Sequence, residues 1–253
     1  VAEYLAKRYG VGGEIKWAMA GRSAAKLAEV REAIGAPKDT PLVTADAADP
    51  ASLRAMAART KAVITTVGPY QLYGSDLVAA CAETGTDYLD LCGEPAWMRK
   101  MIDAHEAAAK KSGARILFSC GFDSIPFELG VYFAQKEAKA RFGKPASRVK
   151  GRVRAMRGGF SGGTFASMKA TMASLSEPGM IQLLTDHFAL TPGFRGPDQP
   201  AGNAPEFDAD IDAWVAPFVM AQINTRNIHR SNLLQGQAYG AEFTYDEMMI
   251  VGD

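Results

Sequence analysis

The chain has 253 residues, of which 47% are hydrophobic and 22% are charged, and its formal net charge at pH 7 is zero. This composition is typical of a globular protein, and the neutral charge gives no overall field that would attract nucleic acid or an anionic membrane. No apolar stretch reaches the roughly 18 residues that span a bilayer. The cysteines Cys81, Cys92 and Cys120 lack metal-ligand spacing, which indicates a reducing, cytoplasmic compartment and no structural metal.

The first residues predict a helix that lacks its natural beginning. Val1, Tyr4, Leu5 and Tyr9 fall on one helical face, yet no initiator Met and no capping residue precede them. The segment that follows is typical of the second strand of a dinucleotide-binding fold. We therefore expect the first strand, and the glycine-rich turn that holds a pyrophosphate, to lie upstream of Val1.

Strands and helices are predicted to alternate up to about residue 125. Ser23 is the predicted cap of one helix, and Asp49 followed by Pro50 is the predicted start of the next. The predicted strands are 15–21, 41–45, 61–67, 87–91 and 115–119. This alternation predicts a doubly wound parallel sheet, which is a Rossmann-type α/β domain, over residues 1–125.

The pattern changes after residue 125, and we predict a second α+β domain over residues 126–253. Residues 148–156 alternate between apolar and basic side chains, which predicts a strand with one face in water. A Met-rich helix over 164–175 and the segment 214–220 are compatible with an apolar substrate pocket, a dimer face or ordinary core packing. The last strand, within 238–251, stops without a natural end, so we expect this domain to be incomplete.

Arg22 stands at the end of the second strand of the dinucleotide fold, beside the expected adenosine ribose. A guanidinium there pairs with the 2′-phosphate of NADP, and Ser23 and Lys26 add a hydroxyl and a second charge. Alternatively, Arg22 is an ordinary solvated arginine at a helix entry. Asp46 closes the next strand, where it either reaches the adenine amino group or only ends the strand.

Several motifs occur along the chain in a fixed order: Ala20-Gly21-Arg22-Ser23, Val67-Gly68-Pro69-Tyr70, Gly85-Thr86-Asp87-Tyr88, Gly93-Glu94, Cys120-Gly121-Phe122-Asp123, the glycine-rich turn 158–163 and Asn224-Thr225-Arg226. Together they resemble the saccharopine dehydrogenase-like oxidoreductases, and among them the bacterial branch that includes trans-acting enoyl reductases. The resemblance implies NADP as the cofactor, a hydride-transfer reaction and a second domain with a mixed sheet. It implies a cofactor site made of Gly21, Arg22, Ser23, Lys26, Asp46, Val67, Gly68, Pro69, Cys120 and Gly121.

Catalytic candidates must lie where parallel strands end, because ligands of open α/β sheets bind there. The residues that meet this condition are Tyr70, Tyr73, Asp90, Glu94, Cys120, Asp123 and Ser124. We predict Tyr70 or Tyr73 as proton donor, because a phenol supplies both a hydrogen bond and a proton. Glu94 is the third candidate, although a carboxylate at that position can also cap a helix.

The sequence therefore predicts an NADP(H)-dependent oxidoreductase that reduces an enoyl or carbonyl group of a lipid-like small molecule. A catalytically silent dinucleotide-binding interaction or regulatory protein is the alternative, and a methyltransferase is disfavoured because Arg22 stands where an acidic residue is expected. Arg154, Arg157 and the glycine-rich turn either hold a substrate phosphate or form a solvated surface. Peripheral membrane contact and a homodimer are both compatible with the apolar segments of the second domain.

Overall fold

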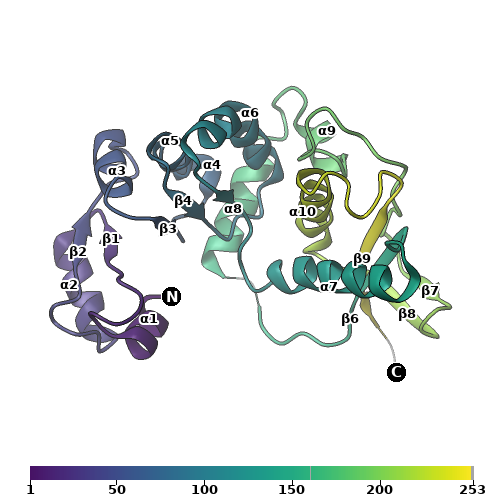
Figure 1. Cartoon of the computed structure of the whole chain (residues 1–253), viewed down its shortest axis with the longest axis horizontal. Helices are drawn as coiled ribbons and strands as arrows, with labels where there is room; N and C mark the ends of the chain where they lie inside the picture. The colour runs from purple at the N-terminus through teal and green to yellow at the C-terminus, as the bar shows by residue number, and fades with distance from the viewer. Residues whose placement is uncertain (160, 252–253) are drawn as a thin grey trace. The chain divides into compact units, whose positions relative to one another are not determined.

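The computed structural model describes residues 1–159 and 161–251, so Phe160 of the glycine-rich turn lies outside the described residues. Figure 1 shows the elements in chain order. The helices are α1 (Ala2–Tyr9), α2 (Ala24–Ala33), α3 (Pro50–Ala57), α4 (Tyr70–Tyr73), α5 (Ser75–Thr84), α6 (Pro95–Ser112), α7 (Ile125–Phe142), α8 (Gly162–Ala173), α9 (Met180–Thr185) and α10 (Ala221–Leu234). The strands are β1 (Met19–Gly21), β2 (Leu42–Thr44), β3 (Ala62–Ile64), β4 (Asp87–Leu89), β5 (Ile116–Leu117), β6 (Arg148–Val153), β7 (Glu206–Asp208), β8 (Ala213–Pro217) and β9 (Thr244–Ile250).

The chain forms two compact units, and β3, β4 and α6 contribute residues to both. Unit 1 consists of Val1–Val63, Tyr73–Tyr88 and Ala108–Ile116. Unit 2 consists of Ile64–Leu72, Leu89–Ala107 and the chain from Leu117 onward. The domain boundary between residues 125 and 126 stays a prediction.

In unit 1, β1 and β2 pair in parallel, and the helices that follow them begin at the predicted caps. The Ser23 hydroxyl accepts a hydrogen bond from the amide of Lys26 at 3.2 Å. The Asp49 carboxylate accepts from two amides of the first turn of α3, with Pro50 at its first position. Each such cap is worth about 1 kcal/mol, so short sequence signals set both helix starts.

The strands β3, β4 and β5 form a sheet in that order. Neighbouring strands run in the same direction, because the Asp87 amide bonds to the Lys61 carbonyl and the Thr65 amide bonds to the Leu89 carbonyl, each at 2.9 Å. Parallel pairing in both sheets confirms the predicted Rossmann-type α/β class. The carboxyl ends of β3, β4 and β5 lead into segments of unit 2 that carry predicted site residues.

Unit 2 also contains a mixed sheet with the order β6-β9-β8-β7. β6 is parallel to β9, whereas β8 is antiparallel to both β9 and β7. α7 and α10 pack beside this sheet (Figure 1), around a core of Val131, Ile228, Tyr239, Phe243 and Tyr245. The expected α+β arrangement with a mixed sheet is thereby confirmed.

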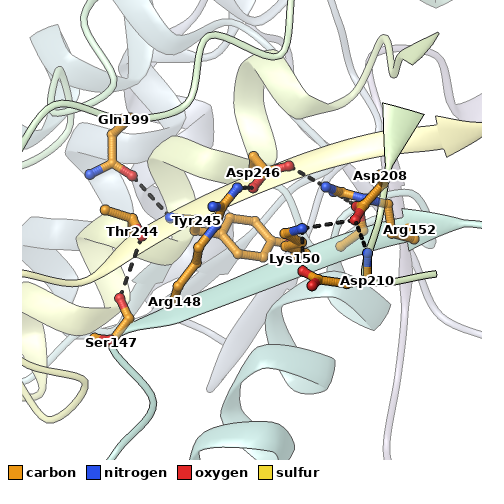
Figure 2. Close-up of polar contacts among 11 residues, drawn as sticks. Ser147, Arg148, Lys150, Arg152, Gln199, Asp208, Asp210, Thr244, Tyr245 and Asp246 are labelled. Atoms are coloured by element: carbon orange, nitrogen blue, oxygen red, sulfur yellow. Dashed lines mark hydrogen bonds and ion pairs between the residues drawn. The ribbon is translucent and has the colours of Figure 1, made fainter. Parts of the chain in front are cut away.

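The basic side of β6 faces water only in part: Arg148 is half exposed as predicted, whereas carboxylates cover Lys150 and Arg152 (Figure 2). Lys150 Nζ lies 2.8 Å from Asp208 Oδ1, and Arg152 lies 2.8 Å from Asp208 and 2.7 Å from Asp246. The Arg152 side chain is only 8% exposed, whereas Arg148, 3.4 Å from the same Asp246, is 50% exposed. We call Lys150, Arg152, Asp208 and Asp246 the sheet network.

Within residues 1–159 and 161–251, no helix combines the length and the hydrophobicity of a membrane-spanning segment. No group of three or more His, Cys, Asp and Glu side chains in the same part of the chain is arranged to hold a metal ion.

Candidate functional site

Three segments of unit 2 follow the parallel strands β3, β4 and β5 and hydrogen-bond to one another. They are residues 65–71, 90–94 and 118–123, and we call them together the strand-end site. Ligands of open parallel sheets bind at such strand ends. The site brings together nine of the residues predicted as cofactor contacts or catalytic candidates, namely Val67, Gly68, Pro69, Tyr70, Asp90, Glu94, Cys120, Gly121 and Asp123.

The first segment turns at a cis peptide bond before Pro69 and enters α4 at Tyr70. The Tyr70 hydroxyl donates to the Thr65 carbonyl at 3.3 Å and accepts from the Leu91 amide at 3.4 Å. Burial raises the pKa of Tyr70, and its ring centroid lies 5.8 Å from that of Trp97. The hydroxyl is therefore bonded to the backbone on both sides, in a place where ionisation is disfavoured.

Glu94 holds this turn from the neighbouring strand end. Its Oε1 accepts from the Tyr70 amide at 3.1 Å, and its Oε2 accepts from the Gln71 amide at 2.7 Å. The residue is buried, so both bonds are shielded from water and are strengthened by the charge of the carboxylate. Both carboxylate oxygens of Glu94 thus bind the backbone of the first segment.

Asp90 joins the second segment to the third. Its Oδ1 accepts from the Cys92 amide at 2.9 Å and from the Ser119 amide at 2.8 Å. Ser119 has a φ of 57°, and its hydroxyl donates to the Cys92 carbonyl at 2.6 Å. A left-handed backbone costs a non-glycine residue about 1–3 kcal/mol, and these hydrogen bonds offset that cost.

Cys120 and Gly121 continue from Ser119. The Cys120 amide donates to the Asp90 carbonyl at 2.6 Å, and burial raises the pKa of its thiol, which is therefore protonated at neutral pH. A Cβ on Gly121 would lie 2.7 Å from Asp123 Oδ1 and 3.3 Å from Leu91 Cβ. The close approach of these two residues explains why a glycine stands at this position.

The predicted cofactor residues Gly21, Arg22, Ser23, Lys26 and Asp46 lie in unit 1, at the ends of the paired strands β1 and β2. Arg22 is exposed and has no hydrogen bond or ion pair with any described residue. Lys26 forms an exposed ion pair with Glu29 at 2.6 Å. Asp46 accepts from the amide of Ala48 at 3.0 Å, so one of its oxygens stabilises its own turn.

Tyr73 also belongs to unit 1, at the end of α4. Its side chain is half exposed, and its hydroxyl makes no hydrogen bond to another described residue. Of the three predicted catalytic residues, Tyr73 therefore keeps its hydroxyl available, whereas Tyr70 and Glu94 are bonded to the protein backbone.

Two parts of this site were not predicted from the sequence. The position of Asp90 at a strand end marked it as a candidate, but its link to the amide of Ser119 depends on the neighbouring strand. Nothing in the sequence around Ser119 indicates a left-handed conformation, because a serine there suits an ordinary turn equally well.

Comparison with known proteins places these observations in a family. Residues 1–117 match the family described as the saccharopine dehydrogenase NADP binding domain. A Mycobacterium tuberculosis protein with the provisional name trans-acting enoyl reductase is 44% identical over 262 residues, which cover 99% of this chain and 62% of that protein. The trans-acting enoyl reductase of Mycobacterium leprae is 41% identical over 247 residues, which cover 93% of this chain and 59% of that protein. This chain thus spans about 60% of the length of the curated relatives that it matches.

A solved structure, the apo form of histidine-tagged saccharopine dehydrogenase (L-Glu forming) from Saccharomyces cerevisiae, is also similar. It has 18% sequence identity and a TM-score of 0.39, and the match covers 55% of this chain and 29% of that chain. The sequence matches confirm the resemblance to saccharopine dehydrogenase-like oxidoreductases. They also confirm the prediction of an NADP-type domain.

Proposed function

Since residues 1–117 match a saccharopine dehydrogenase NADP binding domain and nearly the whole chain resembles trans-acting enoyl reductases, we propose that this protein is an NADP(H)-dependent oxidoreductase. The proposed reaction is reduction of an enoyl or carbonyl group of a lipid-like substrate. Bound NADPH supplies a hydride to one atom of the substrate double bond, and the protein supplies a proton to the other.

The residues present fit NADP. At the end of β1, Arg22 offers an exposed guanidinium with no partner among the described residues, which suits the 2′-phosphate that distinguishes NADP from NAD. In unit 2, the other predicted cofactor residues, among them Gly68, Cys120 and Gly121, share the strand-end site, and ligands of open parallel sheets bind at such strand ends.

The hydrogen bonds suggest different roles for the three predicted catalytic residues. We assign proton donation to Tyr73, because its hydroxyl is exposed and has no partner in the described chain. Tyr70 and Glu94 are positioning residues in this proposal, because their polar atoms hold the turn at 65–71. Neither has to lose a proton for the reaction.

An exposed apolar helix face is the observation that carries the proposal of a lipid-like substrate. α8 exposes Phe165, Met168 and Met172, which lie on one face at helical spacing. Gln71 Nε2 donates to Thr171 Oγ1 at 3.3 Å, so this helix is attached to the turn that Glu94 holds. An acyl chain lying on α8 would therefore bring its reactive end toward the strand-end site.

Replacing Arg22 with alanine is expected to weaken NADPH binding by about 10- to 100-fold, because a charged hydrogen-bonded pair contributes about 1.5–3 kcal/mol. NADH binding should change less than about twofold, since NADH has no 2′-phosphate for Arg22 to contact. Fluorescence titration of the full-length protein with both nucleotides measures this difference. Arg59→Ala, at another exposed arginine of unit 1, is the control and should alter neither affinity. Equal losses for both nucleotides would contradict the assignment of Arg22.

A further inference from the structure

A buried chain of hydrogen bonds connects the strand-end site to the mixed sheet within unit 2. The Tyr245 hydroxyl donates to Glu247 Oε1 at 2.8 Å. Asn224 Nδ2 donates both to Glu247 Oε2 at 2.9 Å and to the Asp123 carbonyl at 3.0 Å. Asn224 and Glu247 are each only 1% exposed, so the bond between them is closed to water, whereas the bond to the exposed Asp123 is only partly buried. These hydrogen bonds thus link β9, through Asn224 on α10, to the segment that carries Cys120 and Gly121.

The orientation of the Asn224 amide is set by this connection. Both of its partners are acceptors, so the nitrogen must face them, and Oδ1 is left without a donor among the described residues. A buried unsatisfied oxygen costs about 1–3 kcal/mol, and the fold retains it. The position of the Asn224 side chain therefore satisfies the two hydrogen bonds of Nδ2 and leaves Oδ1 unsatisfied.

The neighbouring strand β6 leaves room for the hydrogen-bonded pair Tyr245 and Glu247. A Cβ on Gly151 of β6 would lie 2.7 Å from the Tyr245 hydroxyl oxygen and 2.9 Å from Glu247 Cγ. Glycine at this position lets Tyr245 and Glu247 lie against β6. The predicted strand pattern thus contains a glycine where the hydrogen-bonded pair needs space.

The bond to Asp123 acts on a small turn. The amides of Ser124 and Ile125 both donate to the Gly121 carbonyl, at 3.1 and 3.0 Å, so residues 121–125 form a compact turn at the start of α7. Asn224 holds a carbonyl in the middle of this turn. This hydrogen bond fixes the position of the Gly121 backbone relative to β9.

We propose that Asn224 and Glu247 are positioning residues that hold the turn at 121–123 in the geometry that NADP binding requires. They act through the turn and do not touch the cofactor. This inference rests on the proposed function, because Cys120 and Gly121 are the predicted cofactor contacts of that turn. The proposal assigns a role to Asn224, the first residue of the Asn224-Thr225-Arg226 motif, for which the sequence indicated no function.

The test compares Asn224→Ala with Asn232→Ala in the full-length protein. Asn232 lies on the same helix and is also buried, but its amide donates to Gln237 and to the Gly240 carbonyl and accepts from the Tyr239 amide, away from the turn. Asn232→Ala should lower the Tm at least as much as Asn224→Ala, because it removes three hydrogen bonds and Asn224→Ala removes two. Asn224→Ala alone should raise the KM and Kd for NADPH about tenfold, with kcat changed less than about threefold, and speed hydrogen exchange at the amides of Ser124 and Ile125.

Glu247→Leu serves as a second variant if Asn224→Ala folds poorly. A leucine offers no acceptor to Asn224, which keeps only its bond to the Asp123 carbonyl, so a smaller change in the same direction is expected. Equal effects of Asn224→Ala and Asn232→Ala on both NADPH affinity and exchange at the turn would overturn the proposal. If the unmodified protein binds no NADPH, the proposed function fails, whereas the exchange comparison still decides whether Asn224 holds the turn.

Discussion

Replacing Glu94 with alanine is expected to lower NADPH-dependent turnover about 100-fold, because the turn at 65–71 would lose the carboxylate that positions it. The free energy of unfolding should fall by about 3 kcal/mol, since the amides of Tyr70 and Gln71 lose their acceptors, at about 1–3 kcal/mol each. Steady-state kinetics and urea unfolding of the same samples measure the two effects.

A partial replacement of Glu94 and a control at another carboxylate accompany this variant. Glu94→Gln keeps one oxygen and should retain an intermediate turnover, because one of the two amides still has an acceptor. Glu177→Ala removes an exposed carboxylate that pairs with Lys100, and should change the stability by less than about 1 kcal/mol without affecting turnover. Full activity of Glu94→Ala would contradict the positioning role of Glu94.

Replacing Arg152 with methionine is expected to lower the free energy of unfolding by about 3–5 kcal/mol, because Asp208 and Asp246 would keep buried charges without their shared cation. Arg148→Met is the matched control on the same strand. Arg148 is half exposed and contacts Asp246 only at 3.4 Å, so its removal should cost less than about 1 kcal/mol. Similar losses for both variants, measured by urea unfolding, would show that burial does not strengthen the sheet network.

The pH dependence of stability provides a second measure of the sheet network. Hydrogen bonds from Lys150 and Arg152 lower the pKa of Asp208 to about 2, from an unfolded value of 3.8. A carboxylate with a lowered folded-state pKa stabilises the fold above the unfolded pKa, and this contribution is lost as the pH falls from 3.8 toward 2. In Arg152→Met the pKa of Asp208 should rise, so the free energy of unfolding of this variant should fall less as the pH is lowered from 3.8 to about 2.

The sequence predicts the local features of this fold well. Ser23 and Asp49 cap helices as expected, because a cap depends on a side chain and amides only two or three residues away. The parallel sheets follow from the alternation of strand and helix patterns along the chain, whereas the mixed sheet of the second domain is predicted from the family resemblance. Element type is therefore predictable wherever short-range chemistry decides it.

The errors come from contacts between residues far apart in the chain. The basic side of β6 looks water-facing in the sequence, yet Asp208 and Asp246 lie 56 and 94 residues away from Arg152 in sequence and cover it. The carboxylate of Glu94 bonds to amides 23 and 24 residues earlier, a partnership that no local pattern indicates. Asn224 stands out as part of a motif, but its partners in the 121–123 turn and on β9 become visible only in the folded chain.

Transfer of deuterium from NADPH that carries deuterium at both hydrogen positions of the nicotinamide C4 tests the proposed reaction most directly. The full-length protein would be incubated with this cofactor and a long-chain 2-enoyl or 3-keto thioester, and the product analysed by mass spectrometry. Our account predicts one deuterium in each molecule of reduced product, and no reduction when NADPH is omitted. A protein that binds NADPH tightly yet transfers deuterium to neither substrate would contradict it.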